Sequence, residues 1–250
     1  MIITEMTAVF MTSGVRFAIA AFMLWLYRKN RNRFVIAFGL FFLLFGVHGL
    51  FRFFSVTEGN QLLYFVHRIT LIGGTITILY ALKSLGIGWV GKYHAIPAFA
   101  AAATALSYLD SYVFGGVQGE MAFWDHLLAG SYGLAFAHFP TLALGGSGLL
   151  IAAYYFNSFG KGMHTMGKRV MVCGFLLEGL LHFVAPFFIP LGFTWLLFIA
   201  GMVFTAMIGI GWGMSISVYH YPAAAAGSRG RHVSMLEVFL HGKDHNGSGR

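Results

Sequence analysis

Long apolar stretches alternate with short polar connections over the first 220 residues of this chain. A membrane-spanning helix needs about 20 apolar residues, which is close to the length of each stretch. Seven stretches can be marked, covering residues 7–27, 34–54, 61–82, 94–113, 127–155, 170–188 and 192–219. The pattern predicts an all-α fold, a polytopic membrane bundle of seven transmembrane helices formed by residues 1–220, followed by a basic, polar cytoplasmic tail at residues 221–250.

The composition agrees with a membrane protein. Hydrophobic residues make up 58% of the chain and charged residues 10%, whereas soluble domains have about 25% charged residues. The formal net charge of +8 does not indicate a nucleic-acid partner, because the basic residues are scattered through short connections that would face anionic lipid headgroups. Cys173 is the single cysteine, so no intramolecular disulfide is expected. The N-terminus has no basic n-region, and we expect the first stretch to be retained.

The charged connections predict the orientation of the bundle. Of the 16 Lys and Arg residues, 13 lie in alternate connections or in the tail, namely Arg28, Lys29, Arg31, Arg33, Lys83, Lys92, Lys161, Lys168, Arg169, Arg229, Arg231, Lys243 and Arg250. The intervening connections carry Glu58, Asp110, Glu120 and Asp125 instead. Because cytoplasmic loops are enriched in Lys and Arg, we predict an outside N-terminus and a cytoplasmic C-terminus. We expect a multi-pass protein of a bacterial or archaeal cytoplasmic membrane.

Three histidines share one predicted depth in the bundle. His48 lies six residues before the outer end of the second stretch, and His67 lies six residues into the third. His182 lies six residues before the outer end of the sixth stretch. At 1.5 Å per residue, each is roughly 9 Å below the outer boundary. The three imidazoles are therefore candidates for a common site.

Other ionisable residues lie near the same depth. Glu178 is one helical turn deeper than His182, Arg52 is one turn nearer the surface than His48, and Arg68 follows His67. Arg16 lies about ten residues into the first stretch, and His138 lies near the middle of the fifth. An ionised side chain at the membrane centre costs about 2.5–3.5 kcal/mol or more. We therefore predict that Arg16 and Glu178 face each other as a buried ion pair.

This combination favours a cofactor site in the outer half of the bundle. Imidazoles from separate helices can ligate a haem iron axially or hold a transition metal. The candidate cofactor-binding residues are His48, His67, His138, His182, Arg52 and Arg68. Arg52, one turn nearer water than His48, would suit a haem propionate. A bare metal would use His48, His67 and His182. The alternative is that these polar groups only join helix to helix, each pair contributing about 1 kcal/mol or less.

Four functions follow from these two interpretations. The first is an integral membrane subunit that transfers electrons within a membrane complex through haem b or a metal. The second is a seven-helix sensory or ligand-binding module that signals through a protein partner. The third is a structural or assembly subunit of a membrane complex. The fourth is proton or ion movement along Asp125, His138, Glu178 and His182. Whether the chain belongs to an enzyme stays open at this point.

Several local patterns do not indicate a function. Gly86-Ile-Gly88-Trp-Val-Gly91 has the letters of a dinucleotide-binding motif, but no strand precedes it. His241 and His245 have a ligand-like spacing within a polar tail. The seventh stretch has no lysine for a retinal Schiff base, which argues against a retinal protein.

Overall fold

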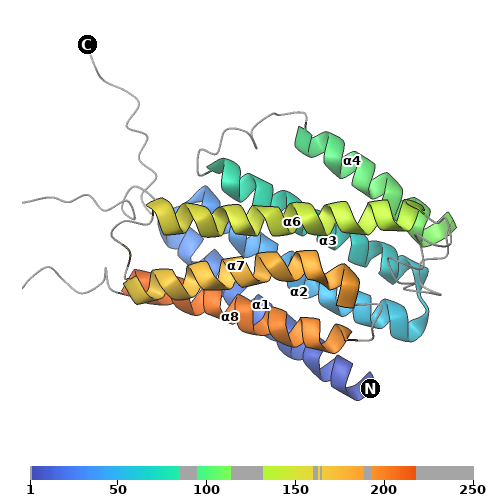
Figure 1. Cartoon of the computed structure of the whole chain (residues 1–250), viewed down its shortest axis with the longest axis horizontal. Coiled ribbons are helices and arrows are strands. Elements are labelled where there is room, and N and C mark those ends of the chain that lie inside the picture. The colour runs from blue at the N-terminus through green and yellow to red at the C-terminus, as the bar shows by residue number, and fades with distance from the viewer. Residues whose placement is uncertain are drawn as a thin grey trace, which may run out of the picture.

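The structure, a computed structural model, describes residues 2–84, 95–113, 132–159, 163, 165–188 and 193–217. All regular secondary structure within these ranges is helical, which confirms the all-α prediction (Figure 1). The elements are α1 (Ile2–Asn30), α2 (Arg33–Glu58), α3 (Gln61–Ser84), α4 (Ala95–Tyr108), η2 (Leu109–Val113), α6 (Tyr132–Phe159), α7 (Thr165–Phe188) and α8 (Thr194–Ser217). The segment η2 is a short π-helix that continues α4.

The seven α-helices fall on the seven predicted apolar stretches, one on each. Four of them are long and apolar enough to cross a membrane in the part of the chain that is described. These segments are Glu5–Arg28, Arg33–Glu58, Gln61–Ser84 and Thr194–Ser215. The predicted tail at 221–250 lies outside the described residues, as do Asp125 and the glycine pattern at 86–91.

Short connections hold α1, α2 and α3 in an antiparallel arrangement. The side chain of Asn32 caps α2 by accepting a hydrogen bond from the backbone N–H of Phe34 at 2.8 Å. At the other end of α2, Gly59 has φ +64°, a left-handed conformation that glycine adopts without strain. Asn60 then accepts hydrogen bonds from the backbone N–H groups of Leu62 and Leu63 at the start of α3. The chain therefore reverses direction within two residues.

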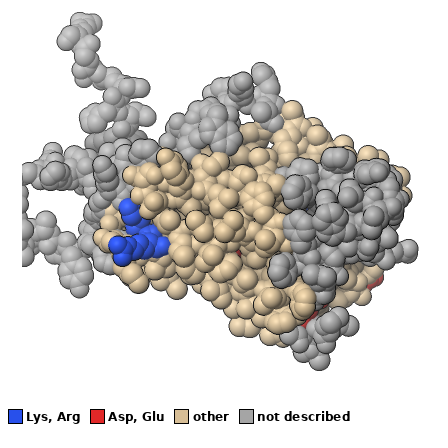
Figure 2. Space-filling model, viewed as in Figure 1, with Lys and Arg blue, Asp and Glu red and all other residues tan. Residues whose placement is uncertain are grey.

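The helices form one bundle in which neighbours in sequence are mostly neighbours in space (Figure 1). Helix α1 contacts both α2 and α8, so the first and last described helices lie side by side. We call the end that holds the turn at Gly59 the Gly59 end, and the opposite one the Asn30 end. Figure 2 shows Lys and Arg side chains gathered at one end of the face drawn. The first two turns of α7 carry Lys168 and Arg169.

Aromatic rings fill the bundle toward the Asn30 end. The rings of Phe34 and Phe38 stack at 4.8 Å between centroids, and Phe34 also stacks on Trp212 at 5.5 Å. The edge of Phe38 meets Phe175 at 5.2 Å, and Phe156 stacks on Phe175 at 5.8 Å. We call these five residues the aromatic core. They come from α2, α6, α7 and α8, so their packing joins four helices.

Candidate functional site

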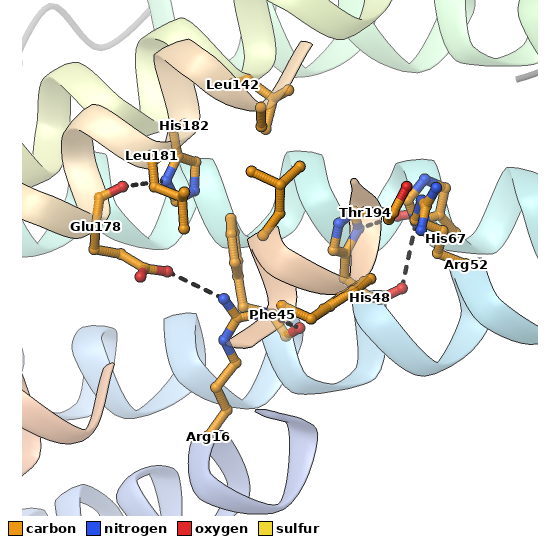
Figure 3. A pocket seen from close by; sticks show the side chains of 13 residues that line it. Arg16, Phe45, His48, Arg52, His67, Leu142, Glu178, Leu181, His182 and Thr194 are labelled. Atoms are coloured by element: carbon orange, nitrogen blue, oxygen red, sulfur yellow. Dashed lines mark hydrogen bonds and ion pairs between the residues drawn. The ribbon is translucent and has the colours of Figure 1, made fainter. Parts of the chain in front are cut away.

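A pocket toward the Gly59 end brings together most of the predicted site residues (Figure 3). The empty space between and in front of its walls, open surroundings included, is about 620 Å³. Its lining comprises Arg16, Phe45, His48, Arg52, His67, Leu142, Glu178, Leu181, His182, Ala185, Thr194, Leu197 and Phe198. Six of the eight predicted site residues are in this set, from helices α1, α2, α3 and α7. We call this site the polar pocket.

The other two predicted residues are not part of this lining. Arg68 is buried in α3, yet it does not line the polar pocket. His138 belongs to α6, and its side chain lies outside the described part of the structure. The predicted role of Arg68 in cofactor binding therefore gains no support from its position.

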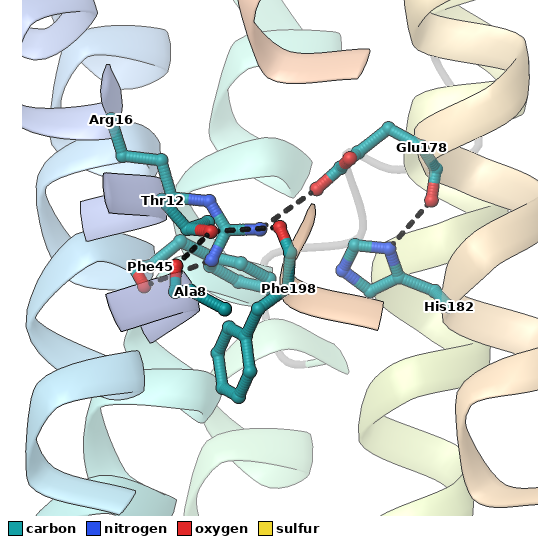
Figure 4. Close-up of polar contacts among 7 residues, drawn as sticks. All are labelled: Ala8, Thr12, Arg16, Phe45, Glu178, His182 and Phe198. Atoms are coloured by element: carbon teal, nitrogen blue, oxygen red, sulfur yellow. Dashed lines mark hydrogen bonds and ion pairs between the residues drawn. The ribbon is translucent and has the colours of Figure 1, made fainter. Parts of the chain in front are cut away.

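Arg16 and Glu178 lie together in the interior, as the cost of burying an ion requires (Figure 4). Nη2 of Arg16 donates to Oε1 of Glu178 at 3.1 Å, and Nη1 donates to the backbone carbonyl oxygen of Phe45 at 3.2 Å. The guanidinium carbon lies 5.4 Å from the centroid of the Phe45 ring. Gly201 of α8 leaves room for this pair, since a Cβ there would lie 3.0 Å from Nη2 of Arg16.

A hydroxyl group fastens α1 to α8 beside the ion pair. Oγ1 of Thr12 lies 2.7 Å from the carbonyl oxygen of Ala8 in its own helix and 2.7 Å from that of Phe198 in α8. Figure 4 shows Thr12 one turn along α1 from Arg16, next to Phe198. The contact between Thr12 and the Phe198 carbonyl oxygen fixes α1, which carries Arg16, against α8.

His48 and His67 form a stacked pair that joins α2 to α3. Their ring centroids are 4.2 Å apart and their planes differ by 25°. Nδ1 of His48 donates to the carbonyl oxygen of His67 at 3.1 Å, and Nδ1 of His67 donates to that of His48 at 3.3 Å. A carbonyl oxygen can only accept, so each Nδ1 carries the hydrogen. In the neutral form of both rings, Nε2 is then an acceptor.

His182 of α7 also uses its Nδ1 to bond a backbone carbonyl oxygen. Its Nδ1 donates to the carbonyl oxygen of Glu178 at 2.8 Å, which leaves Nε2 as the acceptor of the neutral ring. The Phe45 ring lies 5.2 Å from the His182 ring and 5.6 Å from the His48 ring, between centroids. Figure 3 shows Phe45 between the two histidines. An aromatic side chain therefore separates His182 from the stacked pair.

Arg52 lines the pocket on the side of the N-terminal end of α1, where it contacts Glu5. Its Nη1 donates to Oε1 of Glu5 at 3.3 Å, and its guanidinium carbon lies 5.7 Å from the Phe198 ring centroid. Arg52 is buried, whereas the Glu5 side chain is 31% exposed. This second ion pair is therefore partly open to its surroundings.

Buried polar atoms on three of the pocket residues have no hydrogen-bond partner among the described residues. They include Nε of Arg16, Oε2 of Glu178 and Nε2 of His182. All three side chains are buried, with residue exposures of 6%, 1% and 5%. Leaving a buried polar group unsatisfied costs about 1–3 kcal/mol. The residues that line the pocket therefore keep one unused N–H donor and, with neutral His182, two unused acceptors.

The histidines do not gather into a metal centre. The described residues contain no group of three or more His, Cys, Asp or Glu side chains that could hold a metal ion. His48 and His67 contact each other, and Phe45 stands between them and His182. A metal bound by His48, His67 and His182 stays a prediction, without support from this arrangement.

Sequence reasoning missed several residues of the site. Glu5 is the partner of Arg52, and both lie near the predicted outer boundary with opposite charges, which is a usable signal. Phe45 lies three residues before His48 and therefore near the same helix face. Phe198 and Gly201 carry no signal of their own in an apolar stretch. No protein-family model, curated protein or solved structure matches the chain.

Proposed function

We propose that this chain is an integral membrane protein of seven transmembrane helices that binds a small molecule in the polar pocket, in the outer half of its bundle. The observation that carries the proposal is the set of three buried polar atoms without a hydrogen-bond partner around one pocket. A protein that used these residues only to join its helices would gain stability by pairing them. A bound molecule gives them partners and removes the cost.

The walls of the pocket support the same function. Ligand pockets combine apolar surfaces with a few polar groups that fix orientation. Here leucines, Ala185 and two phenylalanines stand beside the polar atoms.

Occluding the pocket tests the proposal with two adjacent leucines. Leu181 lines the pocket, whereas Leu180 is 46% exposed on the surface of the bundle. The small molecules that copurify with the full-length protein in detergent are compared by mass spectrometry. We expect a compound that is retained by the wild type and by Leu180→Trp, and lost from a folded Leu181→Trp. Equal retention by the two variants would contradict binding in this pocket.

The proposed topology has an independent test. Arg31 and Glu58 are exposed at opposite ends of α2, and the positive-inside bias assigns Arg31 to the cytoplasm. Arg31→Cys and Glu58→Cys are made in a Cys173→Ala background and treated in intact cells with a membrane-impermeant maleimide. We expect labelling at position 58 and protection at position 31. The reverse pattern would invert the orientation and place the pocket in the inner half.

A second candidate is a haem b or metal site in an electron-transfer subunit of a membrane complex. The observation that favours it is the donation of Nδ1 to a backbone carbonyl by His48, His67 and His182. Histidines that ligate metals usually bond their other ring nitrogen in this way. Binding of a haem iron between His182 and His48 requires Phe45 to move aside.

Haem binding is tested by adding haemin to the purified full-length protein. A haem site predicts a sharp reduced-minus-oxidised α band in the wild type and in His245→Ala, which changes the tail. The same band should be lost in His182→Ala. A flat difference spectrum in the wild type would end the haem candidate and leave the small-molecule proposal standing. Both candidates expect a protein partner, for signalling in one case and for electron exchange in the other.

A further inference from the structure

Both arginines that line the polar pocket are paired with a carboxylate. Arg16 is paired with Glu178 at 3.1 Å and Arg52 with Glu5 at 3.3 Å. With neutral histidines these four residues sum to zero formal charge. A charged ligand would add an uncompensated charge to a site where ions are costly. The pocket is therefore suited to a neutral molecule.

The hydrogen-bonding capacity of the pocket is uneven. Oε2 of Glu178 and Nε2 of neutral His182 accept, while Nε–H of Arg16 donates. Figure 4 shows the Glu178 carboxylate and the His182 ring on the same side of the Arg16 guanidinium. A complementary ligand must bring two donors and one acceptor. A molecule with two hydroxyl groups does so, because each hydroxyl can both donate and accept.

The aromatic walls of the pocket further restrict the class of ligand that fits it. Phe45 and Phe198 line the pocket and lie beside the two arginines, at 5.4 and 5.7 Å between ring centroid and guanidinium carbon. Flat rings pack favourably against such walls, either stacked or edge to face. A neutral head that combines an aromatic ring with two hydroxyl groups satisfies both the walls and the polar atoms.

We infer that the polar pocket binds an aromatic diol of the hydroquinone type and prefers it to the corresponding quinone. This inference rests on the proposed function, since it names the ligand of the same pocket. The quinone has two carbonyl oxygens and no donor, so it can pair with Arg16 but leaves Glu178 and His182 with acceptors facing acceptors. The reduced and oxidised molecules share one carbon skeleton and differ in this respect.

The preference is measured with duroquinol and duroquinone, whose fully methylated rings do not add to the thiol of Cys173. Full-length protein in detergent is titrated by calorimetry under argon, with dithionite present for the quinol. We expect the dissociation constant of duroquinol to be at least about tenfold lower than that of duroquinone, because each acceptor left unpaired in a buried site weakens binding. The dimethyl ether of duroquinol, which has no donor, should bind as weakly as the quinone.

Two substitutions locate the preference. Glu178→Gln replaces an acceptor by an NH₂ donor, so the quinol-to-quinone preference should fall toward one. His182→Phe removes the Nε2 acceptor and keeps a ring, and it should weaken duroquinol binding several-fold while leaving duroquinone unchanged. Leu180→Phe, on the exposed surface, is the control. If Glu178→Gln fails to fold because Arg16 loses its partner, His182→Phe still tests the inference.

The outcomes separate this inference from the proposed function. Equal or tighter binding of duroquinone, no binding of either compound, or an unchanged preference in a folded His182→Phe would each overturn the diol inference. None of these results touches the copurification experiment with Leu181→Trp, which tests whether the pocket binds a molecule at all. If Leu181→Trp retained the copurifying compound as well as Leu180→Trp does, and still bound duroquinol, the diol site would lie elsewhere. That result would overturn both the proposed function and the diol inference.

Discussion

The aromatic core and the polar pocket are two buried regions of one bundle with opposite chemistry. In the core, rings from four helices pack at 4.8–5.8 Å between centroids. In the pocket, an ion pair and three imidazoles surround a space, and three of their polar atoms lack partners within the described structure. Aromatic rings stabilise the bundle by contacting one another, whereas the pocket carries a cost that binding relieves. Close aromatic packing and unpaired polar atoms are therefore found in different parts of the molecule.

The largest effect is expected from removing one member of the buried ion pair. Glu178→Ala leaves the Arg16 guanidinium buried without its counter-charge, and we expect the free energy of unfolding to fall by about 3–5 kcal/mol. Denaturant unfolding in detergent, followed by tryptophan fluorescence, measures the change. The double variant Arg16→Met with Glu178→Met removes both charges and should recover most of the loss. If the double variant were as unstable as Glu178→Ala, the loss of stability would not come from an unpaired buried charge.

A core substitution should lower stability and leave the ligand preference intact. Phe38→Ala removes a fully buried ring that packs on Phe34 and Phe175, at an expected cost of roughly 3 kcal/mol. Phe54→Ala, on the exposed side of the same helix, is the control and should change little. The duroquinol-to-duroquinone ratio of folded Phe38→Ala should equal that of the wild type. A changed ratio would mean that the two regions are coupled rather than separate.

An intermediate effect is expected where α8 approaches the ion pair. Gly201→Val places side-chain atoms about 3 Å from Nη2 of Arg16, so the guanidinium must shift and its bond to Glu178 weakens. We expect a loss of about 1–3 kcal/mol together with weaker duroquinol binding. Gly213 lies on the same helix with open space where its Cβ would be, and Gly213→Val is the matched control. Similar losses in the two variants would point to helix propensity or lipid contact instead.

The smallest effect is expected at the partly exposed ion pair. Glu5→Gln breaks the bond to Arg52, but the Glu5 side chain is 31% exposed, so we expect a loss below about 1 kcal/mol. Raising the salt concentration should lower the stability of the wild type slightly and leave the variant unaffected. Glu58→Gln, an exposed acidic residue at the same end of the bundle, controls for the change in net charge. A loss comparable to that of Glu178→Ala would show that Arg52 depends on Glu5 for burial.

The distribution of apolar residues was enough to predict the helices and their approximate ends, because each must satisfy its own backbone hydrogen bonds. The approach of Arg16 to Glu178 followed from the cost of isolated ions, whereas the predicted depth of the histidines in a membrane stays a prediction. The direction in which each helix faces was not predictable in the same way. Arg68 is adjacent to His67 in sequence, yet it does not line the pocket. The insertion of Phe45 between His48 and His182 depends on helix rotation and spacing, which the order of residues does not specify.

The length of the turn at Gly59 also determines which residues of α2 and α3 lie opposite each other. His48 and His67 reach each other because they stand at matching heights above it on α2 and α3, and each bonds to the other's carbonyl oxygen. Surface turns usually tolerate insertions. One residue added between Gly59 and Asn60, if the added residue were absorbed into α3, would rotate His67 by about 100° around its helix axis and part the two rings. The length of this turn therefore decides whether the two histidines meet.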